Sequence, residues 1–271
     1  MGPLLTVETG EAMRRALAAG LCTLDCSLNL GLSRDTVELS AAGFSLHGQH
    51  YPWPKRLKEN TVYYWDSREF APVARFGGAL IKLKPTVWGP PTFEIDGIKM
   101  LPSAKLSPWQ DAEQKVALIE PRGKCILDTC GGLGYFAAWC LRAGASEVHS
   151  FEKSADVLWL RTLNPWSPQP SSALHLRLAD VHVEIAALSN ARFDAILHDP
   201  PRFGIAGELY AQAFYVELAR VLKRGGKMFH YTGTPNQLSS GRDLPLEVIK
   251  RLQRAGFEAV RKADGVLAMK R

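Results

Sequence analysis

Three acidic residues in the middle of the sequence, Asp128, Glu152 and Asp180, each follow a short apolar segment. If these segments are parallel strands, the acids meet at the carboxyl edge of one sheet, where open α/β folds bind their ligands. At such an edge Glu152 is placed to accept hydrogen bonds from both hydroxyls of a ribose, and Asp180 to approach an adenine amine. The three acids therefore predict a nucleoside-binding site.

A glycine-rich turn opens at the first of these acids, in the order Asp128-Thr129-Cys130-Gly131-Gly132-Leu133-Gly134. Glycine lets backbone approach a ligand where a Cβ atom would clash. Residues 135–143, which follow, are predicted to form a helix whose first N–H groups suit a carboxylate such as that of methionine. Alone, Gly132-Leu133-Gly134 with Ala137 also satisfies a weak dinucleotide-binding pattern. The ordered acids argue against that alternative.

This series of strand-end acids resembles the class I S-adenosylmethionine (SAM)-dependent methyltransferases. In that superfamily the first acid and its glycine loop hold the methionine part of SAM, the second acid holds the ribose, and the third lies near adenine. The resemblance implies SAM as the cofactor. The residues it implies for cofactor binding are Asp128, Cys130, Gly132, Gly134, Tyr135, Glu152, Lys153, Asp180, Val181 and Asp199. Cys130 departs from the family pattern, because it stands where the loop commonly has its first glycine.

A second motif, His198-Asp199-Pro200-Pro201-Arg202, follows the apolar segment 193–197 and matches the fourth methyltransferase motif in placement. In family members that act on amino groups, the rigid Pro-Pro turn directs oxygen atoms at the target nitrogen. The resemblance implies that Asp199, His198 and Arg202 address the acceptor in a direct in-line transfer, most simply to nitrogen. Tyr210, on a predicted helix, is expected on the substrate side.

The Asp-Pro-Pro-Arg form also resembles the uracil-C5 RNA methyltransferases. Those enzymes need a cysteine nucleophile at the next strand end, and residues 231–236 contain none. That chemistry is therefore not expected.

Residues 97–257 resemble more closely a group of predicted, mainly archaeal, SAM-dependent methyltransferases, which implies a fold and a cofactor more than a reaction. The resemblance rests on Asp128-Thr129-Cys130, Gly132-Leu133-Gly134-Tyr135, Asn164-Pro165-Trp166-Ser167, His198-Asp199-Pro200-Pro201-Arg202-Phe203, Ala206-Gly207-Glu208-Leu209-Tyr210, Phe214-Tyr215 and Phe229-His230-Tyr231.

The segments 206–215 and 222–226 also resemble the aminopropyltransferases that make spermidine. Those enzymes share the fold, use decarboxylated SAM, carry a small N-terminal β-domain and bind a cationic polyamine through acids. Asp199 and Glu208 are the candidate acids here, but Arg202 among them would repel a polyamine, which places this alternative second. A third alternative is a non-catalytic SAM-fold binding subunit, against which the intact acids argue.

The elements that must position these residues divide the chain near residue 105. Residues 1–105 are predicted to form a small β-rich N-terminal domain with a helix at 9–19 and its longest strand at 23–32. In residues 106–271 strand-like and helix-like segments alternate. This alternation predicts a Rossmann-like α/β domain, in which a mostly parallel sheet has helices on both faces. Residues 207–222 are predicted to form one helix.

The composition is that of an ordinary globular protein, with 46% hydrophobic and 22% charged residues. No apolar run approaches the roughly 18 residues of a membrane span, so we expect a cytoplasmic location without membrane contact. The net charge of +6 weakly favours an anionic partner such as RNA. An RNA or protein substrate is the first expectation, and a polyamine or other small-molecule acceptor and a homodimer stay open.

The sequence predicts no metal site. The five cysteines are irregularly spaced and form no paired zinc-ligand pattern, so we expect reduced thiols. His198 and His230 should lie near neighbouring strand ends, where they could join Asp199 and Glu208 around a metal or in acid–base chemistry. Their spacing is not diagnostic for a metal, and we expect both histidines to hydrogen-bond within the sheet edge.

Overall fold

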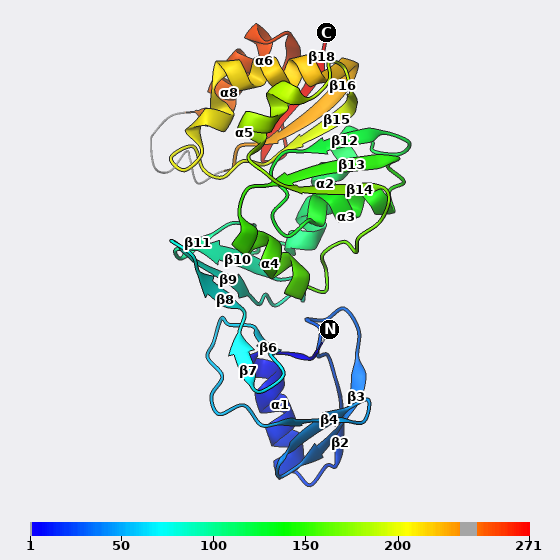
Figure 1. The fold of residues 1–271 in the computed structure, drawn as a ribbon, viewed down its shortest axis with the longest axis vertical. Coiled ribbons are helices and arrows are strands. Elements are labelled where there is room, and N and C mark those ends of the chain that lie inside the picture. The colour runs from blue at the N-terminus through cyan, green and yellow to red at the C-terminus, as the bar shows by residue number, and fades with distance from the viewer. Residues whose placement is uncertain (1, 234–242) are drawn as a thin grey trace. The chain divides into compact units, whose positions relative to one another are not determined.

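The computed structural model describes residues 2–233 and 243–271, and the chain divides into two compact units (Figure 1). One unit comprises Met1–Gln110 and Trp159–Ser167, and the other comprises Asp111–Leu158 and Pro168–Arg271. Helix α4 (Ala155–Leu163) begins in the second unit and ends in the first.

The second unit is built on a seven-stranded sheet in the order β14-β13-β12-β15-β16-β18-β17. The strands from β14 to β16 are parallel, and β18 is antiparallel to both of its neighbours. The strand bounds are β12 (Cys125–Asp128), β13 (Glu147–Glu152), β14 (Leu174–Leu178), β15 (Phe193–His198), β16 (Leu222–Tyr231), β17 (Phe257–Lys262) and β18 (Gly265–Lys270). The predicted Rossmann-like α/β fold, with its mostly parallel sheet, is confirmed.

Burial on both faces explains why β12, in the middle of the sheet, is apolar up to its terminal Asp128. Ile126 and Leu127 of β12 are adjacent and point to opposite faces, yet neither is exposed to solvent. One face packs with helices α5 (Val181–Glu184), α6 (Gln212–Val221) and α8 (Leu244–Arg254) in a single hydrophobic core. Helices α2 (Pro108–Ile119) and α3 (Tyr135–Arg142) complete the unit. This packing holds the carboxyl ends of the parallel strands in place.

The single helix predicted over residues 207–222 is wrong in detail. A 3₁₀ turn, η2 (Gly207–Tyr210), precedes α6, and Ala211 between them is extended with φ −71° and ψ 149°. The carbonyl oxygen of Tyr210 accepts a 2.6 Å hydrogen bond from Arg251 of α8 instead of an intrahelical one. The break in the helix is therefore stabilised by Arg251, a residue outside the segment, and the local sequence does not reveal this contact.

The first unit is β-rich, as predicted. It contains helix α1 (Val7–Ala18) and three small antiparallel sheets, in the orders β1-β6-β7, β11-β10-β9-β8 and β2-β3-β4-β5. The strand bounds are β1 (Leu4–Leu5), β2 (Thr23–Cys26), β3 (Asp35–Ser40), β4 (Gly43–Leu46), β5 (Gln49–Pro52), β6 (Tyr63–Trp65), β7 (Phe70–Pro72), β8 (Ala74–Phe76), β9 (Leu80–Lys84), β10 (Thr92–Ile95) and β11 (Ile98–Lys99).

The long strand predicted at 23–32 ends at Cys26. Leu30 and Gly31 both have positive φ, 55° and 83°, which turns the chain out of the extended conformation.

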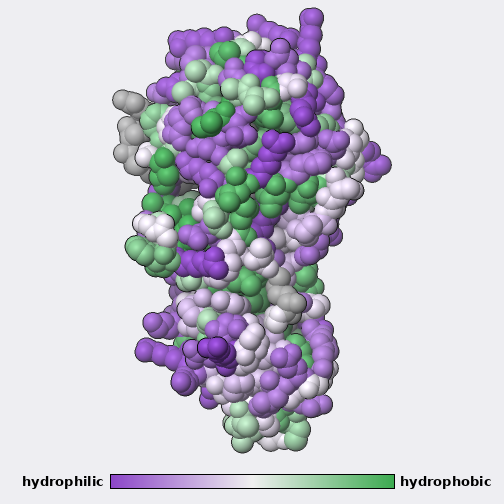
Figure 2. Space-filling model, in the orientation of Figure 1, coloured by the Kyte–Doolittle hydropathy of each residue, from purple (hydrophilic) through white to green (hydrophobic). Residues whose placement is uncertain are grey.

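No helix among the described residues is long and apolar enough to cross a membrane. Hydrophilic residues predominate on the face of the molecule drawn in Figure 2.

Candidate active site

The glycine turn lies between two buried strand ends. Gly132 and Gly134 have φ of 48° and 83°, in the left-handed region that glycine adopts without strain. The N–H of Gly131 donates to the carbonyl oxygen of Phe151 on β13 at 2.7 Å. Asp128 is 1% exposed and accepts a 2.8 Å hydrogen bond from the Ser150 hydroxyl. These hydrogen bonds hold both the turn and the buried carboxylate of Asp128 against β13.

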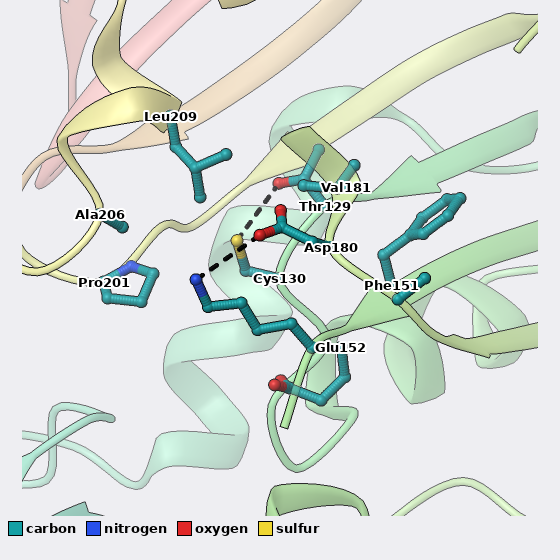
Figure 3. A pocket seen from close by; sticks show the side chains of 11 residues that line it. Thr129, Cys130, Phe151, Glu152, Asp180, Val181, Pro201, Ala206 and Leu209 are labelled. Carbon is teal, nitrogen blue, oxygen red and sulfur yellow. Dashed lines mark hydrogen bonds and ion pairs between the residues drawn. The ribbon is translucent and has the colours of Figure 1, made fainter. Parts of the chain in front are cut away.

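A cavity of about 380 Å³, including the space at its mouth, opens beside this turn (Figure 3). Five of the ten predicted cofactor residues line it: Cys130, Glu152, Lys153, Asp180 and Val181. Of the other five, Asp128 and Tyr135 are buried, Gly132 and Gly134 shape the turn, and Asp199 is half-buried. The remaining lining residues, which the sequence did not single out for the cofactor, are Thr129, Phe151, Ala179, Pro201, Ala206 and Leu209.

Two carboxylates stand at the edge of the cavity. Glu152 accepts hydrogen bonds from the N–H groups of Gly132 and Ser154, both at 2.9 Å. Asp180 caps α5 by accepting from the N–H of His182, while its other oxygen lies 3.7 Å from the ammonium of Lys153. Lys153 is more than half exposed, so this ion pair is weak and the lysine side chain can move away from Asp180.

Cys130, which replaces the usual glycine, lies within the turn. Burial raises the pKa of its thiol well above 9.0, against the effect of a contact with the Thr129 hydroxyl. The side chain is therefore a neutral thiol at the cavity wall, shown with Thr129 in Figure 3.

His198 and His230 are buried, and each ring nitrogen of each has a partner. Nε2 of His198 donates to the carbonyl oxygen of Leu209 at 3.1 Å, so Nδ1 is left to accept from the Thr129 hydroxyl at 2.8 Å. Nδ1 of His230 donates to the carbonyl oxygen of Tyr231, and its Nε2 accepts from the Tyr215 hydroxyl, both at 2.9 Å. Burial lowers the pKa of His198 to about 4 and that of His230 well below 6.5, so both are neutral at pH 7.

Asp199 lies at one end of a row formed by three strand ends. His198 pairs with His230 across β15 and β16, and Tyr231 pairs with Gly265 across β16 and β18. Asp199, Tyr231 and Asp264 therefore follow one another along the carboxyl edge of the sheet.

Lys115 of α2 joins this row. Its ammonium lies 2.6 Å from Asp111, 3.2 Å from Asp264 and 4.0 Å from the centre of the Tyr231 ring, and the residue is only 2% exposed. We call Lys115, Asp111, Asp199, Tyr231 and Asp264 the lysine–carboxylate cluster.

The cluster shifts the protonation of its members. Burial raises the pKa of Asp199 to about 7, although the charge of Lys115 opposes the rise. Burial lowers the pKa of Lys115, but the carboxylates of Asp199, Asp111 and Asp264 outweigh it and raise the pKa above 10.5. The lysine stays charged, and Asp199 titrates near neutral pH.

Sequence reasoning missed this cluster except for Asp199. The spacing of Asp111 and Lys115 is that of an ordinary i,i+4 pair on a helix surface, and Asp264 lies in a hairpin about 150 residues away. No pattern in the sequence connects these positions.

Arg202 and Tyr210 occupy different environments. Arg202 is exposed, and its carbonyl oxygen accepts from the N–H groups of Ile205 and Ala206. Tyr210 is 1% exposed and donates from its hydroxyl to the carbonyl oxygen of Pro201 at 3.1 Å. Tyr210 thus braces the Pro-Pro turn, whose Pro201 lines the cavity.

The strand order, with a glycine turn after β12 and acids at successive strand ends, defines the fold of the class I SAM-dependent transferases. Spermidine synthase in complex with the transition-state analogue AdoDATO aligns with a TM-score of 0.55 and 15% identity, covering 80% of this chain and 81% of that one. MNMC2 from Aquifex aeolicus aligns with a TM-score of 0.53 and 18% identity, covering 73% and 72%. An S-adenosylmethionine-dependent methyltransferase from Mesorhizobium loti covers 60% of this chain at a TM-score of 0.45 and 17% identity, and all of that chain is covered.

The chain belongs to the family of the protein MJ1233 from Methanocaldococcus jannaschii. The two are 39% identical over 217 residues, which cover 78% of this chain and 74% of MJ1233. The name of MJ1233 states no activity. No family model matches the chain.

Proposed function

We propose that this chain is a SAM-dependent methyltransferase that transfers the methyl group directly to a nitrogen of an RNA or protein substrate. The observation that carries the proposal is a cavity that has Glu152 and Asp180 at its edge and Pro201 of the Asp199-Pro200-Pro201 turn in its wall. The residues that we propose for the donor and for the acceptor belong to one unit.

The residues that line the cavity fit SAM in their chemistry. Val181 and Leu209 offer apolar surface to an adenine ring, and Glu152 can accept from ribose hydroxyls. The turn at Gly132 and Gly134 would hold the methionine part at the start of α3, near the positive end of the helix dipole.

SAM, when bound, supplies an electrophilic methyl group, and the protein's part is orientation and charge. Asp199 in its ionised form would accept a hydrogen bond from the acceptor nitrogen and then its proton. Tyr210 would keep the Pro-Pro turn in place through Pro201. His198 would act by positioning Leu209 and Thr129, and Arg202 would meet the acceptor from its exposed position.

Aminopropyl transfer from decarboxylated SAM to a polyamine is the second candidate function. The lysine–carboxylate cluster favours it, because three carboxylates there face a single ammonium. In addition, Oδ1 of Asp264 is buried and has no hydrogen-bond partner among the described residues. A cationic amine would supply the missing donor. A non-catalytic binding subunit ranks third, because it does not need this set of charged groups.

Calorimetry with SAM and with decarboxylated SAM tests the donor. We expect SAM to bind more tightly. Glu152→Gln should weaken binding about 10- to 100-fold, because a hydrogen bond to a charged group is worth about 1.5–3 kcal/mol. Glu113→Gln, an exposed change on α2, is the matched control and should bind normally. A preference for decarboxylated SAM would favour the second candidate, and failure to bind either donor would overturn both enzymatic functions.

The acceptor side is tested by transfer of labelled methyl from SAM to total RNA and to total protein. We expect Asp199→Ala to abolish transfer while SAM binding stays within a few-fold of normal. Normal turnover by this variant would show that the acceptor binds elsewhere.

A further inference from the structure

A second group of polar side chains lies at the opposite edge of the same sheet, where its strands begin. Cys125 opens β12 and is paired with Glu147, the first residue of β13. His149 is two residues further along β13 and is paired with His175 on β14. Because side chains alternate along a strand and pair across neighbouring strands, all four point to one face of the sheet.

These four side chains bring together one thiol, one carboxylate and two imidazoles. Oε2 of Glu147 lies 3.0 Å from Nε2 of His149, 3.9 Å from Sγ of Cys125 and 3.9 Å from Nε2 of His175. The ligand atoms of Cys125, Glu147 and His149 all lie within 4.8 Å of one another. In a tetrahedral zinc site the ligand atoms stand about 3.3–3.6 Å apart, as metal–ligand distances of about 2.0–2.3 Å require. The rings of His149 and His175 are stacked at 4.4 Å with 19° between their planes, so His175 must rotate about its side-chain bonds to turn a nitrogen toward the ion.

The contacts of His149 cannot all be hydrogen bonds. Its side chain is 4% exposed, and its Nε2 faces both the Glu147 carboxylate and Nη2 of Arg192, at 3.0 and 3.2 Å. A single imidazole nitrogen either carries a proton for the carboxylate or offers a lone pair to the guanidinium. A cation between His149 and Glu147 removes this conflict, because it takes the lone pair and the carboxylate together.

Arg192 marks the place where such a cation would bind. Its guanidinium contacts Nε2 of His149 at 3.2 Å, and so places a positive charge beside the proposed ligands. Arg192 is an exposed residue, so its guanidinium can move into solvent when an ion enters.

We propose that Cys125, Glu147, His149 and His175 bind a zinc ion that ties together β12, β13 and β14. Thiolate, imidazole and carboxylate ligands suit zinc, and four protein ligands make a closed, structural site rather than a catalytic one. The sequence predicted no metal, because these ligands come from three strands and have no characteristic spacing. The proposal is independent of the proposed SAM chemistry.

The test uses cobalt(II) as a spectroscopic substitute for zinc in the metal-stripped chain of 271 residues. We expect one cobalt per chain, a thiolate-to-cobalt charge-transfer band in the near ultraviolet, and intense visible bands of tetrahedral cobalt. Cys125→Ser should lose the charge-transfer band, and His149→Asn should lose the intense visible bands. Cys22→Ser, which removes an exposed thiol of the other unit, is the matched control and should behave as wild type.

Two outcomes would overturn the site: no thiolate band in the wild-type protein, or a band that persists in Cys125→Ser. Neither depends on SAM binding, and the wild-type spectrum is informative even if a variant misfolds. Arg192→Ala gives an independent check. Removing the competing charge should tighten cobalt binding about two- to fivefold, the size of an exposed ion-pair effect. Weaker binding would instead make Arg192 part of the native cluster and contradict the proposal.

Discussion

At the scale of single residues, Asp199 links the fold to the proposed chemistry. It directly precedes the Pro-Pro turn, and its carboxyl group belongs to the lysine–carboxylate cluster. Burial raises its pKa to about 7, whereas an exposed aspartate has a pKa near 3.9. A small change in its surroundings therefore changes how much of it is ionised at neutral pH.

The pH dependence of transfer follows from this titration. Below pH 7 the carboxyl group holds its proton and cannot accept from an amine, and above pH 7 it can. We expect the rate of methyl transfer to rise with pH and to level off above a midpoint near 7. Single-turnover rates across this range measure the midpoint. Asp199→Asn should remove both the activity and the midpoint, while a wild-type rate that does not change through neutral pH would contradict the role of Asp199.

At the scale of elements, α2 is fastened to the carboxyl edge of the sheet by Lys115. Replacing this lysine with methionine would leave Asp111 and Asp264 without their counter-charge. We expect Lys115→Met to cost about 3 kcal/mol of unfolding free energy at pH 7, as removal of one member of a buried ion pair does. The same change should move the midpoint of the transfer profile above 7, because Lys115 opposes the rise in the pKa of Asp199.

Urea unfolding and the pH profile measure the two effects. Lys227→Met is the control, because its partner Glu120 is exposed and the pair should contribute less than about 1 kcal/mol. Adding Asp111→Asn to Lys115→Met should restore part of the stability. Equal losses for Lys115→Met and Lys227→Met would show that burial of the cluster has no energetic consequence.

The same elements show what the sequence could predict. The parallel strands with acids at or just after their ends were predictable, because β12 is apolar up to Asp128, β13 ends at Glu152, and β15 ends one residue before Asp199. The break at Ala211 was not predictable, because it depends on Arg251, which is distant in sequence. Apolar cavity walls such as Leu209 look like ordinary core residues in a sequence, and only the tertiary fold makes them part of a site.

At the scale of the whole molecule, the two buried histidines make stability depend on pH. His198 and His230 are neutral in the folded protein because burial lowers their pKa, whereas an unfolded histidine has a pKa near 6.5. Between pH 6.5 and about 4 the unfolded chain therefore binds more protons than the folded one. Stability is fully present above 6.5 and is lost as the pH falls, by about 1.4 kcal/mol per pH unit for each histidine.

Urea unfolding at a series of pH values measures this slope. His198→Gln, which keeps a donor for Leu209, should make the slope shallower by one proton in this window. An unchanged slope would mean that His198 is charged when folded. Asp111 and Asp199 act in the opposite direction, because a raised folded pKa gives stability that declines as the pH rises toward that pKa, which is about 7 for Asp199.

The pairing of Lys115 with Asp264 affects the order in which parts of the protein can fold during its synthesis. These residues are 149 positions apart, from 264 minus 115. At about 5–20 residues per second, a ribosome needs roughly 7–30 s to pass from one codon to the other. During that interval the nascent chain already carries the lysine and Asp111, but the hairpin that completes their charge balance does not yet exist. The glycine turn at Gly132 could form early, because its partner strand β13 is synthesised within seconds of it. The lysine–carboxylate cluster would form later, once the hairpin with Asp264 has been synthesised.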